Sequence, residues 1–546
     1  MTTGADPSPV SWPVLLERGV ALHRAGDLPA AQHLYRRVLE LLPAQADAVN
    51  LLGIIGLQTG DVESAVSLGR QACRLDPTHA SYHLSLGNAL RAARQFAAAA
   101  EEFTTAISLR PDYAEAHNNL GLALADQNQQ EAAIAAFQRA VALQPSAAMA
   151  WNNLGSALRR AGQPAEAAKA CRSAIAADPA FAPAHNTLAN ALLDLDDPES
   201  AVVGFRQAIR LDPAAPASAD AYANLCHAEY RAGHFDAAVA AGQAAIKLFP
   251  DFPAAHWNLA HALLILGDFA AGFAEYEWRI HCPPPTCPPA PPPGIERWTG
   301  QPLAGKTILL QSEQGLGDTI QFIRYAKPLA DRGAQVLLQC PPPLAPLLEH
   351  APGIAALAGL NPQVDFFCPL MSLPHRLGTI PADIPYLTAD PARLPIARNR
   401  DETHVGLAWA GRRDYANDRN RSMPHSALAP LASIPRLRLH SLHITGSPPV
   451  DLPILNHASQ IKDFADSAAL ISQLDLVISV DTAVAHLAGA LGKPTWLLLP
   501  HIPDCRWQLD RDDSPWYPTV RLFRQFRPGD WQTVIGDVVS TLDQLG

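Results

Sequence analysis

The sequence predicts an α-solenoid of eight helical hairpins, followed by an α/β domain made of two small lobes. Three observations support this fold class. A 34-residue repeat fills the first half of the chain, a proline-rich segment follows it, and strand-like apolar runs then alternate with helical patterns. The predicted boundaries are 1–280 for the solenoid, 281–298 for the linker, 299–398 for the amino-terminal lobe and 399–546 for the carboxyl-terminal lobe.

The composition is that of a globular protein, with 48% hydrophobic and 17% charged residues in a chain of 546. The net charge of -11 argues against nucleic acid or an anionic membrane surface as the main partner. We expect a cytoplasmic protein without membrane insertion, because the sequence has neither a signal-like start nor a run of about 18 apolar residues. The eight cysteines include no CxxC pair, so the spacing predicts neither a disulfide framework nor a zinc module.

The repeat is marked by turn-forming pairs and by prolines that recur every 34 residues. The one longer step, of 37 residues, coincides with an insertion after Pro213. A helix, a turn, a second helix and a closing proline at this period are the tetratricopeptide (TPR) pattern, and stacked copies place the first helices on a concave face. The turn pairs begin at Gly26, Gly60, Arg94, Asn128, Gly162, Asp196, Gly233 and Gly267.

A polar column precedes the leucine of five first helices: Asn119, Asn153, Thr187, Asn224 and Asn258. Asparagine is a mediocre helix former, so its recurrence on one helix face needs a reason. Side-chain amides donate and accept hydrogen bonds, as binding to an extended peptide backbone requires. The array resembles the repeat region of O-GlcNAc transferase, in which such a ladder holds protein acceptors. We therefore expect the four asparagines to bind a polypeptide acceptor on the concave face; the alternative is that they satisfy helix ends or solvent.

The repeats end in the segment HCPPPTCPPAPPPG, which begins at His281. Proline at this density prevents a helix and favours an extended connection. Cys282 and Cys287 flank the first prolines, and a metal site with His281 is conceivable, but their spacing favours ordinary linker cysteines. Tyr276 and Trp278, just before the segment, are expected to pack the end of the array against the α/β domain.

The amino-terminal lobe begins with an apolar strand at 306–311 that runs into a glycine-containing loop. The G-x-G of this loop suggests a dinucleotide site, but position 320 is Ile, so the third glycine of that fingerprint is missing. Gly315 and Gly317 instead allow close backbone approach, and Asp318 places a carboxylate at the start of a helix. Further strands are expected at 335–339 and 364–367, with a helix at 344–350.

The carboxyl-terminal lobe is expected to open with a strand at 404–409 that ends at Ala410 and Gly411. The next segment, GRRDYANDRNRSMP, is the most cationic of the domain, and its arginines could bind a diphosphate bidentately. A solvated basic loop is the alternative for each of them. The candidates are Arg412, Arg413, Arg419 and Arg421. Another strand is expected at 438–446.

The stretch from Asp475 to Leu499 reads as strand, tight turn, helix and strand, which is one βαβ unit of a buried parallel sheet. The turn at Asp481 and Thr482 lies at the carboxyl end of a strand, where open α/β sheets bind ligands, and the free N–H groups of the following helix favour an anion. A structural turn with a plain N-cap is the alternative. A D-x-D at Asp510 lies in a polar loop, which disfavours a metal-dependent transferase.

Two motifs carry a family resemblance. DTAVAHLAGALGKP, from Asp481, is similar to the carboxyl-terminal signature of heptosyltransferase-like glycosyltransferases, and SEQGLGDTIQFIRY, from Ser312, resembles their amino-terminal loop. The resemblance covers roughly residues 300 to 546. It implies a GT-B-like domain of two Rossmann-like lobes. The chain departs from the family in having Ala483 where glycine is usual and in a shorter transferase region.

The resemblance also implies roles for individual residues. Asp318 would be the general base of an inverting displacement. Arg421, by its position before a Ser-x-Pro, would contact the diphosphate of a nucleotide-sugar, with no obligatory metal or other cofactor. A core position is the alternative for His486. The expected donor-binding residues are Gly315, Gly317, Gly411, Arg421, Asp481, Thr482, Ala483 and His486.

The sequence thus predicts a glycosyltransferase that moves a sugar from a nucleotide-sugar to a polypeptide captured by the repeats. Two alternatives remain. The protein could be a non-catalytic adaptor with a degenerate nucleotide-binding domain, or a transferase that acts on a lipid-linked or polysaccharide acceptor. The presence of both the Gly317–Asp318 loop and the Asp481 turn favours an active enzyme.

Overall fold

A computed structural model describes residues 11–213, 218–359, 362–399, 401–412, 417–444 and 452–544. The chain forms two compact units, of which unit 1 is 1–228 and unit 2 is 229–546. This division falls within the first helix of the seventh hairpin, so the second helix of that hairpin and the whole eighth hairpin belong with the α/β lobes. The domain boundary predicted from the sequence lies at 280. Among the described residues, no helix has the length and apolar character needed to cross a membrane.

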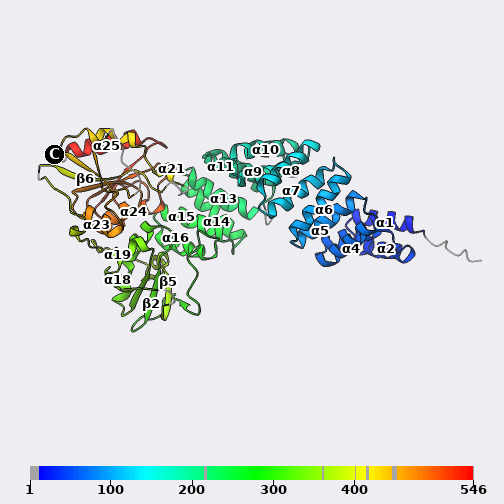
Figure 1. Ribbon diagram of the computed structural model, residues 1–546, viewed down its shortest axis with the longest axis horizontal. Helices are drawn as coiled ribbons and strands as arrows, with labels where there is room; N and C mark the ends of the chain where they lie inside the picture. The colour runs from blue at the N-terminus through cyan, green and yellow to red at the C-terminus, as the bar shows by residue number, and fades with distance from the viewer. Residues whose placement is uncertain are drawn as a thin grey trace, which may run out of the picture. The chain divides into compact units, whose positions relative to one another are not determined.

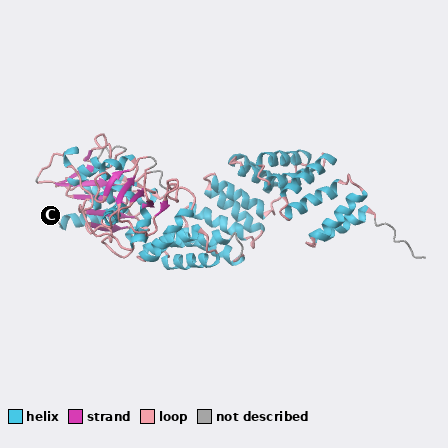
Figure 2. Ribbon diagram, turned by 90° about the horizontal axis from the view of Figure 1, so that it is seen from below, coloured by secondary structure: helices cyan, strands magenta, loops and turns pink. Residues whose placement is uncertain are grey.

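The predicted helical hairpins are confirmed. Figure 1 shows them as successive helix pairs, and Figure 2 shows that the strands are confined to the α/β part. The helices of the first six hairpins are α1 Trp12–Arg24, α2 Leu28–Leu41, α3 Ala46–Gln58, α4 Val62–Leu75, α5 Ala80–Ala92, α6 Phe96–Leu109, α7 Ala114–Asp126, α8 Gln130–Leu143, α9 Ala148–Arg160, α10 Pro164–Ala177, α11 Ala182–Asp194 and α12 Pro198–Leu211. The last two hairpins comprise α13 Ser218–Arg231, α14 Phe235–Leu248, α15 Pro253–Ile265 and α16 Phe269–Tyr276.

Small residues let the two helices of a hairpin approach closely. A Cβ atom on Gly121 would lie 2.6 Å from the Phe137 ring, so glycine in the first helix accommodates the buried aromatic ring of the second. Aspartates begin several second helices by capping them: Asp27 accepts a hydrogen bond from the backbone N–H of Ala30 at 3.1 Å.

A hydrogen bond from an aromatic ring to a proline carbonyl recurs in five repeats and was not predicted. A ring N–H in the first helix donates to the carbonyl of the proline six residues earlier, which ties each first helix to the turn before it. The pairs are His83 with Pro77 at 3.1 Å, His117 with Pro111 at 3.1 Å, Trp151 with Pro145 at 2.9 Å, His185 with Pro179 at 3.0 Å and His256 with Pro250 at 2.8 Å.

The two lobes each contain a parallel sheet, as the fold class requires. The amino-terminal sheet has the order β1-β5-β2-β3-β4, and the carboxyl-terminal sheet has the order β11-β10-β9-β6-β7-β8. The strands of the first are β1 Glu296–Arg297, β2 Thr307–Gln311, β3 Gln335–Gln339, β4 Ile354–Leu357 and β5 Phe366–Pro369. Those of the second are β6 Thr403–Ala408, β7 Leu437–Ser441, β8 Ile454–Asn456, β9 Leu476–Val480, β10 Thr495–Leu499 and β11 Val520–Arg524.

Short helices connect these strands and cover the sheets. Strand β1 lies at the end of the proline-rich segment and pairs with β5, so that segment joins the amino-terminal sheet before residue 299. The helices are α17 Leu316–Phe322, α18 Ala326–Ala330, α19 Ala345–Leu348, α20 Leu373–Leu377, α21 Asp418–Arg421, α22 Ala429–Ala432, α23 Phe464–Ser472, α24 Ala483–Ala490 and α25 Trp531–Gln544.

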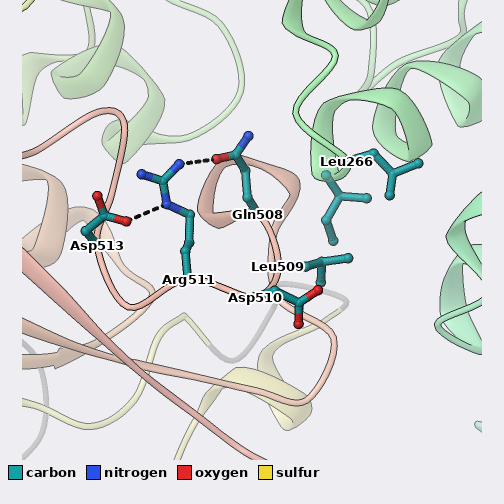
Figure 3. A pocket seen from close by; sticks show the side chains of 7 residues that line it. Leu266, Gln508, Leu509, Asp510, Arg511 and Asp513 are labelled. Atoms are coloured by element: carbon teal, nitrogen blue, oxygen red, sulfur yellow. Dashed lines mark hydrogen bonds and ion pairs between the residues drawn. The ribbon is translucent and has the colours of Figure 1, made fainter.

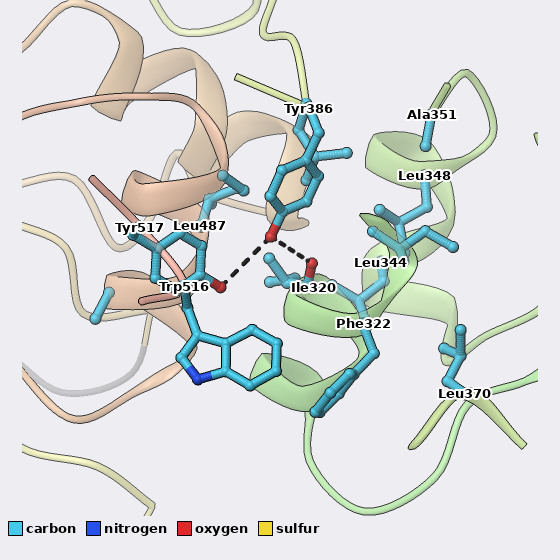
Figure 4. Packing of buried hydrophobic residues seen from close by; sticks show 14 of the residues in the cluster. Ile320, Phe322, Leu344, Leu348, Ala351, Leu370, Tyr386, Leu487, Trp516 and Tyr517 are labelled. Carbon is cyan, nitrogen blue, oxygen red and sulfur yellow. Dashed lines mark hydrogen bonds between the residues drawn. The ribbon is translucent and has the colours of Figure 1, made fainter. Parts of the chain in front are cut away.

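One hydrophobic core joins the last hairpin to both lobes. Phe273 and Tyr276 of α16 share it with Phe322 of the amino-terminal lobe and Trp516 of the carboxyl-terminal lobe. Figure 4 shows the lobes meeting in this core, where the Tyr386 hydroxyl donates to the Ile320 carbonyl at 3.0 Å. The expectation for Tyr276 is therefore confirmed. Trp278 instead stacks on His256 within the array, with ring centroids 3.9 Å apart.

The carboxyl-terminal lobe buries a chain of three histidines. His404 Nδ1 lies 3.0 Å from His440 Nε2, and His440 Nδ1 lies 3.0 Å from His457 Nε2. Burial, with the neighbouring histidines and the charges of Arg438 and Arg398, lowers the pKa of His440 to about 3. His440 is therefore neutral in the folded protein at physiological pH.

These histidines predict acid sensitivity. Since the pKa of His440 is depressed in the native state, the unfolded state binds more protons below pH 6.5, and stability present above that pH is lost as the pH falls. Between pH 7 and 5, His440 alone should cost about 2 kcal/mol of unfolding free energy. Urea unfolding followed by tryptophan fluorescence measures this. The His440→Gln variant should show a smaller difference between pH 7 and 5, and exposed His350→Gln should behave like the unmodified chain.

Candidate functional site

The two loops singled out in the sequence come from different lobes and meet. A Cβ atom on Gly317, at the start of α17, would lie 2.8 Å from His486 Cδ2 and 3.3 Å from Ala483 Cα, at the start of α24. Only glycine at this position lets the two helices approach so closely. Asp318 accepts a hydrogen bond from the Gly315 backbone N–H at 2.8 Å and so closes the first turn of α17. The structure thus brings together Gly315, Gly317, Asp318, Ala483 and His486.

Arg506 connects the two lobes at this meeting point. It lies in a short 3-10 turn, Cys505–Trp507, and its Nη1 forms an ion pair with Asp318 Oδ1 at 2.8 Å. The Nε of Arg506 contacts Asp504 Oδ1 at 2.7 Å, and Nη1 also donates to Gln321 Oε1 at 3.0 Å. Neither Arg506 nor Asp504 was predicted as a site residue, because an irregular loop carries no periodic signal.

The surroundings shift the pKa values of Asp481, Asp504 and His486 in different directions. Burial and the nearby Asp504 raise the pKa of Asp481. For Asp504, the charge and hydrogen bonds of Arg506 outweigh burial and lower the pKa. Burial and the Arg506 charge hold the pKa of His486 well below its ordinary value. A neutral histidine and carboxylates of unlike acidity thus lie around one arginine, as is common in functional sites.

His486 lies in the core, which was the alternative to a donor-binding role for this residue. Its side chain is 3% exposed, its Nδ1 lies 3.0 Å from the Tyr517 hydroxyl, and its ring stacks on Trp507 at 5.3 Å between centroids. Its Nε2 faces Asp481 Oδ1 at 3.9 Å and Arg506 Nη1 at 3.4 Å. The imidazole is therefore buried beside the charged groups of Asp481 and Arg506.

A second arginine reaches the Asp481 turn from α21. Arg421 Nη1 donates to the Asp481 carbonyl at 3.1 Å, and its Nε pairs with Asp418 Oδ1 at 3.3 Å. Gly411 lies against the Arg421 guanidinium, where a Cβ would clash with it, and its N–H donates to the Ser422 hydroxyl at 2.9 Å. Arg421, Gly411 and Asp481 are therefore adjacent.

The start of α24 lies at the same edge of the sheet. Thr482 is the N-cap of α24, and its hydroxyl lies 3.2 Å from that of Ser479. The candidate Arg413 lies outside the described residues. The Arg421 guanidinium and the amino end of α24 therefore both lie at the carboxyl end of β9. This combination favours the binding of an anion.

The end of the repeat array holds the glycine-containing loop in place. Arg279, just after α16, is fully buried and forms two 2.8 Å contacts with the Glu313 carboxylate. Glu313 also accepts the Met371 N–H at 2.9 Å, and Gln314 Nε2 donates to the Tyr276 hydroxyl at 2.8 Å. Gln314 has a φ of 58°, a left-handed conformation that is rare for residues other than glycine. This loop, which leads directly into Gly315 and Asp318, thus depends on the repeats.

Helix α15 brings the last member of the asparagine column to the same region. Asn258 lies one turn before His261 on the same helix face. Burial lowers the pKa of His261, whose ionisation is also affected by the charges of Asp504 and Arg506. A predicted acceptor-binding position in unit 2 therefore borders the turn that carries Arg506.

In unit 1 two members of the asparagine column, Asn119 and Asn153, take part in a series of side-chain hydrogen bonds across successive hairpins. Asn119 Nδ2 donates to Asn88 Oδ1 at 2.9 Å, Asn118 Nδ2 donates to Asn119 Oδ1 at 3.0 Å, and Asn153 Nδ2 donates to Asn118 Oδ1 at 2.9 Å. Asn88 and Asn118 were not predicted. A carboxamide has two donors and two acceptor positions, so these bonds use one donor and one acceptor position of Asn119. Asn224, on α13, is half-buried.

A cavity of about 470 Å³ opens between the end of α15 and the loop after the Arg506 turn (Figure 3). Arg511 bridges its polar side, with Nε 2.7 Å from Asp513 Oδ1 and Nη1 2.6 Å from Gln508 Oε1. Gln508 and Asp510 have φ values of 52° and 47°, a conformation that costs energy and often marks functional loops. The lining residues are Ile265, Leu266, Gln508, Leu509, Asp510, Arg511 and Asp513.

Comparisons with known families agree with the two-part organisation. Tetratricopeptide repeat models match residues 16–80, 84–147, 125–180, 158–225 and 223–277. The glycosyltransferase family 9 (heptosyltransferase) model matches residues 462–498, the segment that contains the Asp481 turn and α24. The chain thus carries TPR repeats in its amino-terminal region and a glycosyltransferase-like segment near its carboxyl end.

Comparisons with individual proteins cover parts of the chain. Protein FlbA of Caulobacter vibrioides is 27% identical over 373 residues, which span 60% of this chain and 62% of FlbA, less than two thirds of its length. A thermophilic TPR protein of Thermus thermophilus, TTC0263, aligns with 34% of this chain and 100% of its own, at 25% identity and a TM-score of 0.30. The Cut9–Hcn1 hetero-tetramer of the APC/C aligns over 50% of this chain and 53% of its own, at 18% identity and a TM-score of 0.40.

Proposed function

We propose that this protein is a glycosyltransferase that moves a sugar from a nucleotide-sugar to a polypeptide acceptor bound by the repeat array. The observation that carries the proposal is the meeting of the Gly317–Asp318 loop of one lobe with the Asp481 turn of the other, around Arg506. Two lobes that join a carboxylate to an anion-favouring helix start suit the transfer of a sugar from a diphosphate.

The donor would bind at the carboxyl end of β9. Its diphosphate would accept hydrogen bonds from the first N–H groups of α24 and from Arg421, while Asp481 would bind sugar hydroxyls. In this arrangement the helix start and the guanidinium supply the positive charge that a metal ion supplies in other transferases.

The catalytic base would be Asp318, which is paired with Arg506 in this structure. A diphosphate that engages Arg506 would leave the carboxylate able to take the proton of the acceptor hydroxyl. That oxygen would bond to the anomeric carbon as the bond to the phosphate oxygen breaks, and the nucleoside diphosphate would leave. General base catalysis of this kind contributes about 10²- to 10⁴-fold in rate.

The acceptor would reach the site along α15, past Asn258 and His261. The cavity beside Leu266 would take one acceptor side chain with an apolar stem and a basic end, since its wall combines Leu509 with the carboxylate of Asp510, while Asp513 is paired with Arg511. Long basic side chains bury their stems and leave the charge beside acidic groups in this way.

A panel of nucleotide-sugars tests the proposal. UDP-, GDP-, ADP- and CMP-sugars would be added to the full chain at saturating concentration, and one should raise the melting temperature, because a ligand at 100 times its Kd stabilises by about 2.7 kcal/mol. The same donor, radiolabelled in its sugar, should label a protein fraction. If no nucleotide-sugar stabilises the chain, the transferase proposal is wrong.

A non-catalytic adaptor is the second candidate, and the close contact of Gly317 with Ala483 and His486 favours it, because this contact fills space between the lobes. A chain that binds a nucleotide-sugar, turns none over and still retains a protein partner would support the adaptor.

Replacing Arg421 by Ala should weaken donor binding by about 1.5–3 kcal/mol, the usual range for a hydrogen bond to a charged group. Isothermal calorimetry measures the change. Arg438→Ala is the matched control, because Arg438 is an exposed arginine near the amino end of β7. The donor would bind at the opposite, carboxyl ends of the strands of this sheet. Equal donor affinity in the two variants would assign Arg421 a purely structural role.

Replacing Asn119, Asn153, Asn224 and Asn258 together by Ala should raise the KM for the protein acceptor by about two orders of magnitude or more, because four lost amide contacts at about 0.5–1.5 kcal/mol each add up to about 2–6 kcal/mol. Donor hydrolysis without acceptor should be unchanged. Since Asn119 and Asn153 also bond within the array, circular dichroism must show that the helices remain. A normal KM in a folded variant would mean that the column does not bind the acceptor.

A further inference from the structure

A cysteine, a histidine and a glutamate converge in unit 1, whereas the proposed transfer site belongs to unit 2. Cys73 lies near the end of α4, His83 on α5 and Glu102 on α6, and their ligand atoms all lie within 4.8 Å of one another. His83 is buried and the other two are half-buried. Its Nδ1 lies 2.6 Å from Glu102 Oε2. The repeat packing therefore assembles this cluster from residues that are 10 and 19 positions apart.

The orientation of His83 suits a ligand. Its Nε2–H donates to the Pro77 carbonyl at 3.1 Å, so in the neutral ring the lone pair is on Nδ1, which faces the other two side chains. Metal-bound histidines almost always donate their second N–H in this way, to a carbonyl or a carboxylate, which fixes both the tautomer and the ring direction.

The repeat array provides an internal comparison. His256 and Glu275 reproduce the same pair in the last hairpin, with Nδ1 2.5 Å from Oε2 and Nε2 2.8 Å from the Pro250 carbonyl. There the position of Cys73 is taken by Ile246. The histidine–glutamate pair alone is thus a structural feature, and the thiol is what one copy adds. The same position is aliphatic in the other repeats: Leu39, Ile107, Val141, Ile175 and Ile209.

We propose that Cys73, His83 and Glu102 bind a single Zn²⁺ or similar divalent transition-metal ion. Sulfur, imidazole nitrogen and carboxylate oxygen are the donors that Zn²⁺ takes, and water or a fourth group completes a tetrahedron. A thiolate, a carboxylate and a neutral imidazole balance the charge of the ion. Binding releases the thiol proton to solvent, together with any proton held between His83 and Glu102, and involves no redox step. The ion would link two successive hairpins across α4, α5 and α6.

Cobalt(II) tests the site, because a thiolate ligand gives it a near-ultraviolet sulfur-to-metal absorption band. The full chain, reduced and freed of metal by chelation, should show this band and saturate at one equivalent. Cys73→Ile, which installs the residue found in the equivalent repeats, should abolish the band. Glu102→Gln, which keeps a hydrogen-bond acceptor for His83, should raise the Kd more than about 100-fold, beyond the loss expected for an outer-shell partner.

Two controls keep the result interpretable. Zn²⁺ should raise the melting temperature of the unmodified chain but not that of Cys73→Ile, whose helicity should match the parent. A Cys282→Ser, Cys287→Ser double variant should keep the band. If the band survives in Cys73→Ile, or disappears only in the double variant, the ion binds elsewhere and the proposal is wrong.

Discussion

Replacing Arg279 by Met should lower the unfolding free energy of unit 2 by about 3–5 kcal/mol, because it leaves the buried Glu313 carboxylate without its cation. Arg279 is fully buried and contacts Glu313 through two nitrogens, so no solvent can replace it. Chemical unfolding followed by tryptophan fluorescence measures the loss, since eight of the ten tryptophans lie in unit 2. The proposed transfer activity should fall with it, because the loop before Gly315 loses its anchor.

A milder variant separates stability from positioning. Tyr276→Phe removes only the hydroxyl that accepts from Gln314, at a cost of about 0.5–1.5 kcal/mol, and keeps the buried ring. It should reduce kcat while the KM for the donor stays within a few-fold. Arg332→Met, an exposed arginine of the same lobe, is the control for the first variant. If Arg279→Met is as stable as this control, the buried pair contributes no net stability.

Replacing Asp318 by Asn should reduce sugar transfer about 10²- to 10⁴-fold, because the amide cannot take the acceptor proton. The amide oxygen can still accept the Gly315 N–H, so the first turn of α17 should persist. Donor affinity should remain within a few-fold of the parent, as measured by calorimetry. Asp331→Asn, an exposed residue paired with Lys327 on the same lobe, is the matched control. Transfer at the parent rate in Asp318→Asn would exclude this residue as the base.

Local pattern accounts for what could be predicted. The repeats follow from a fixed period. Strand β3 matches the predicted range 335–339, and β9 and β10 are the two strands of the unit predicted between Asp475 and Leu499, because each is a short apolar run between turn signals. Strands β4, β8 and β11 were not predicted. The first two have only four and three residues, and the third lies in a segment rich in charged and aromatic residues, so none shows a clear pattern.

The site was predictable only in part. Gly317 and Asp481 lie next to predicted strands, so motif position identified them. Arg506 and Asp504 acquire their importance from neighbours 20 or more positions away, such as Asp318 and His486, and only the folded chain reveals that. The hydrogen bonds from histidines to proline carbonyls could have been predicted, since His83, His117 and His185 each lie six residues after a repeat proline.

Because α15 and α16 share one core with the lobes, recombination cannot exchange the whole repeat array as a separate module. The proline-rich segment at 281–298 resembles a natural point of exchange, yet a crossover there would separate Tyr276 and Arg279 from Gln314 and Glu313. A hybrid that receives a foreign array should fold only when the crossover lies before α15, so that the last hairpin is inherited with the lobes. The last hairpin should therefore share the ancestry of the lobes even where the earlier hairpins do not.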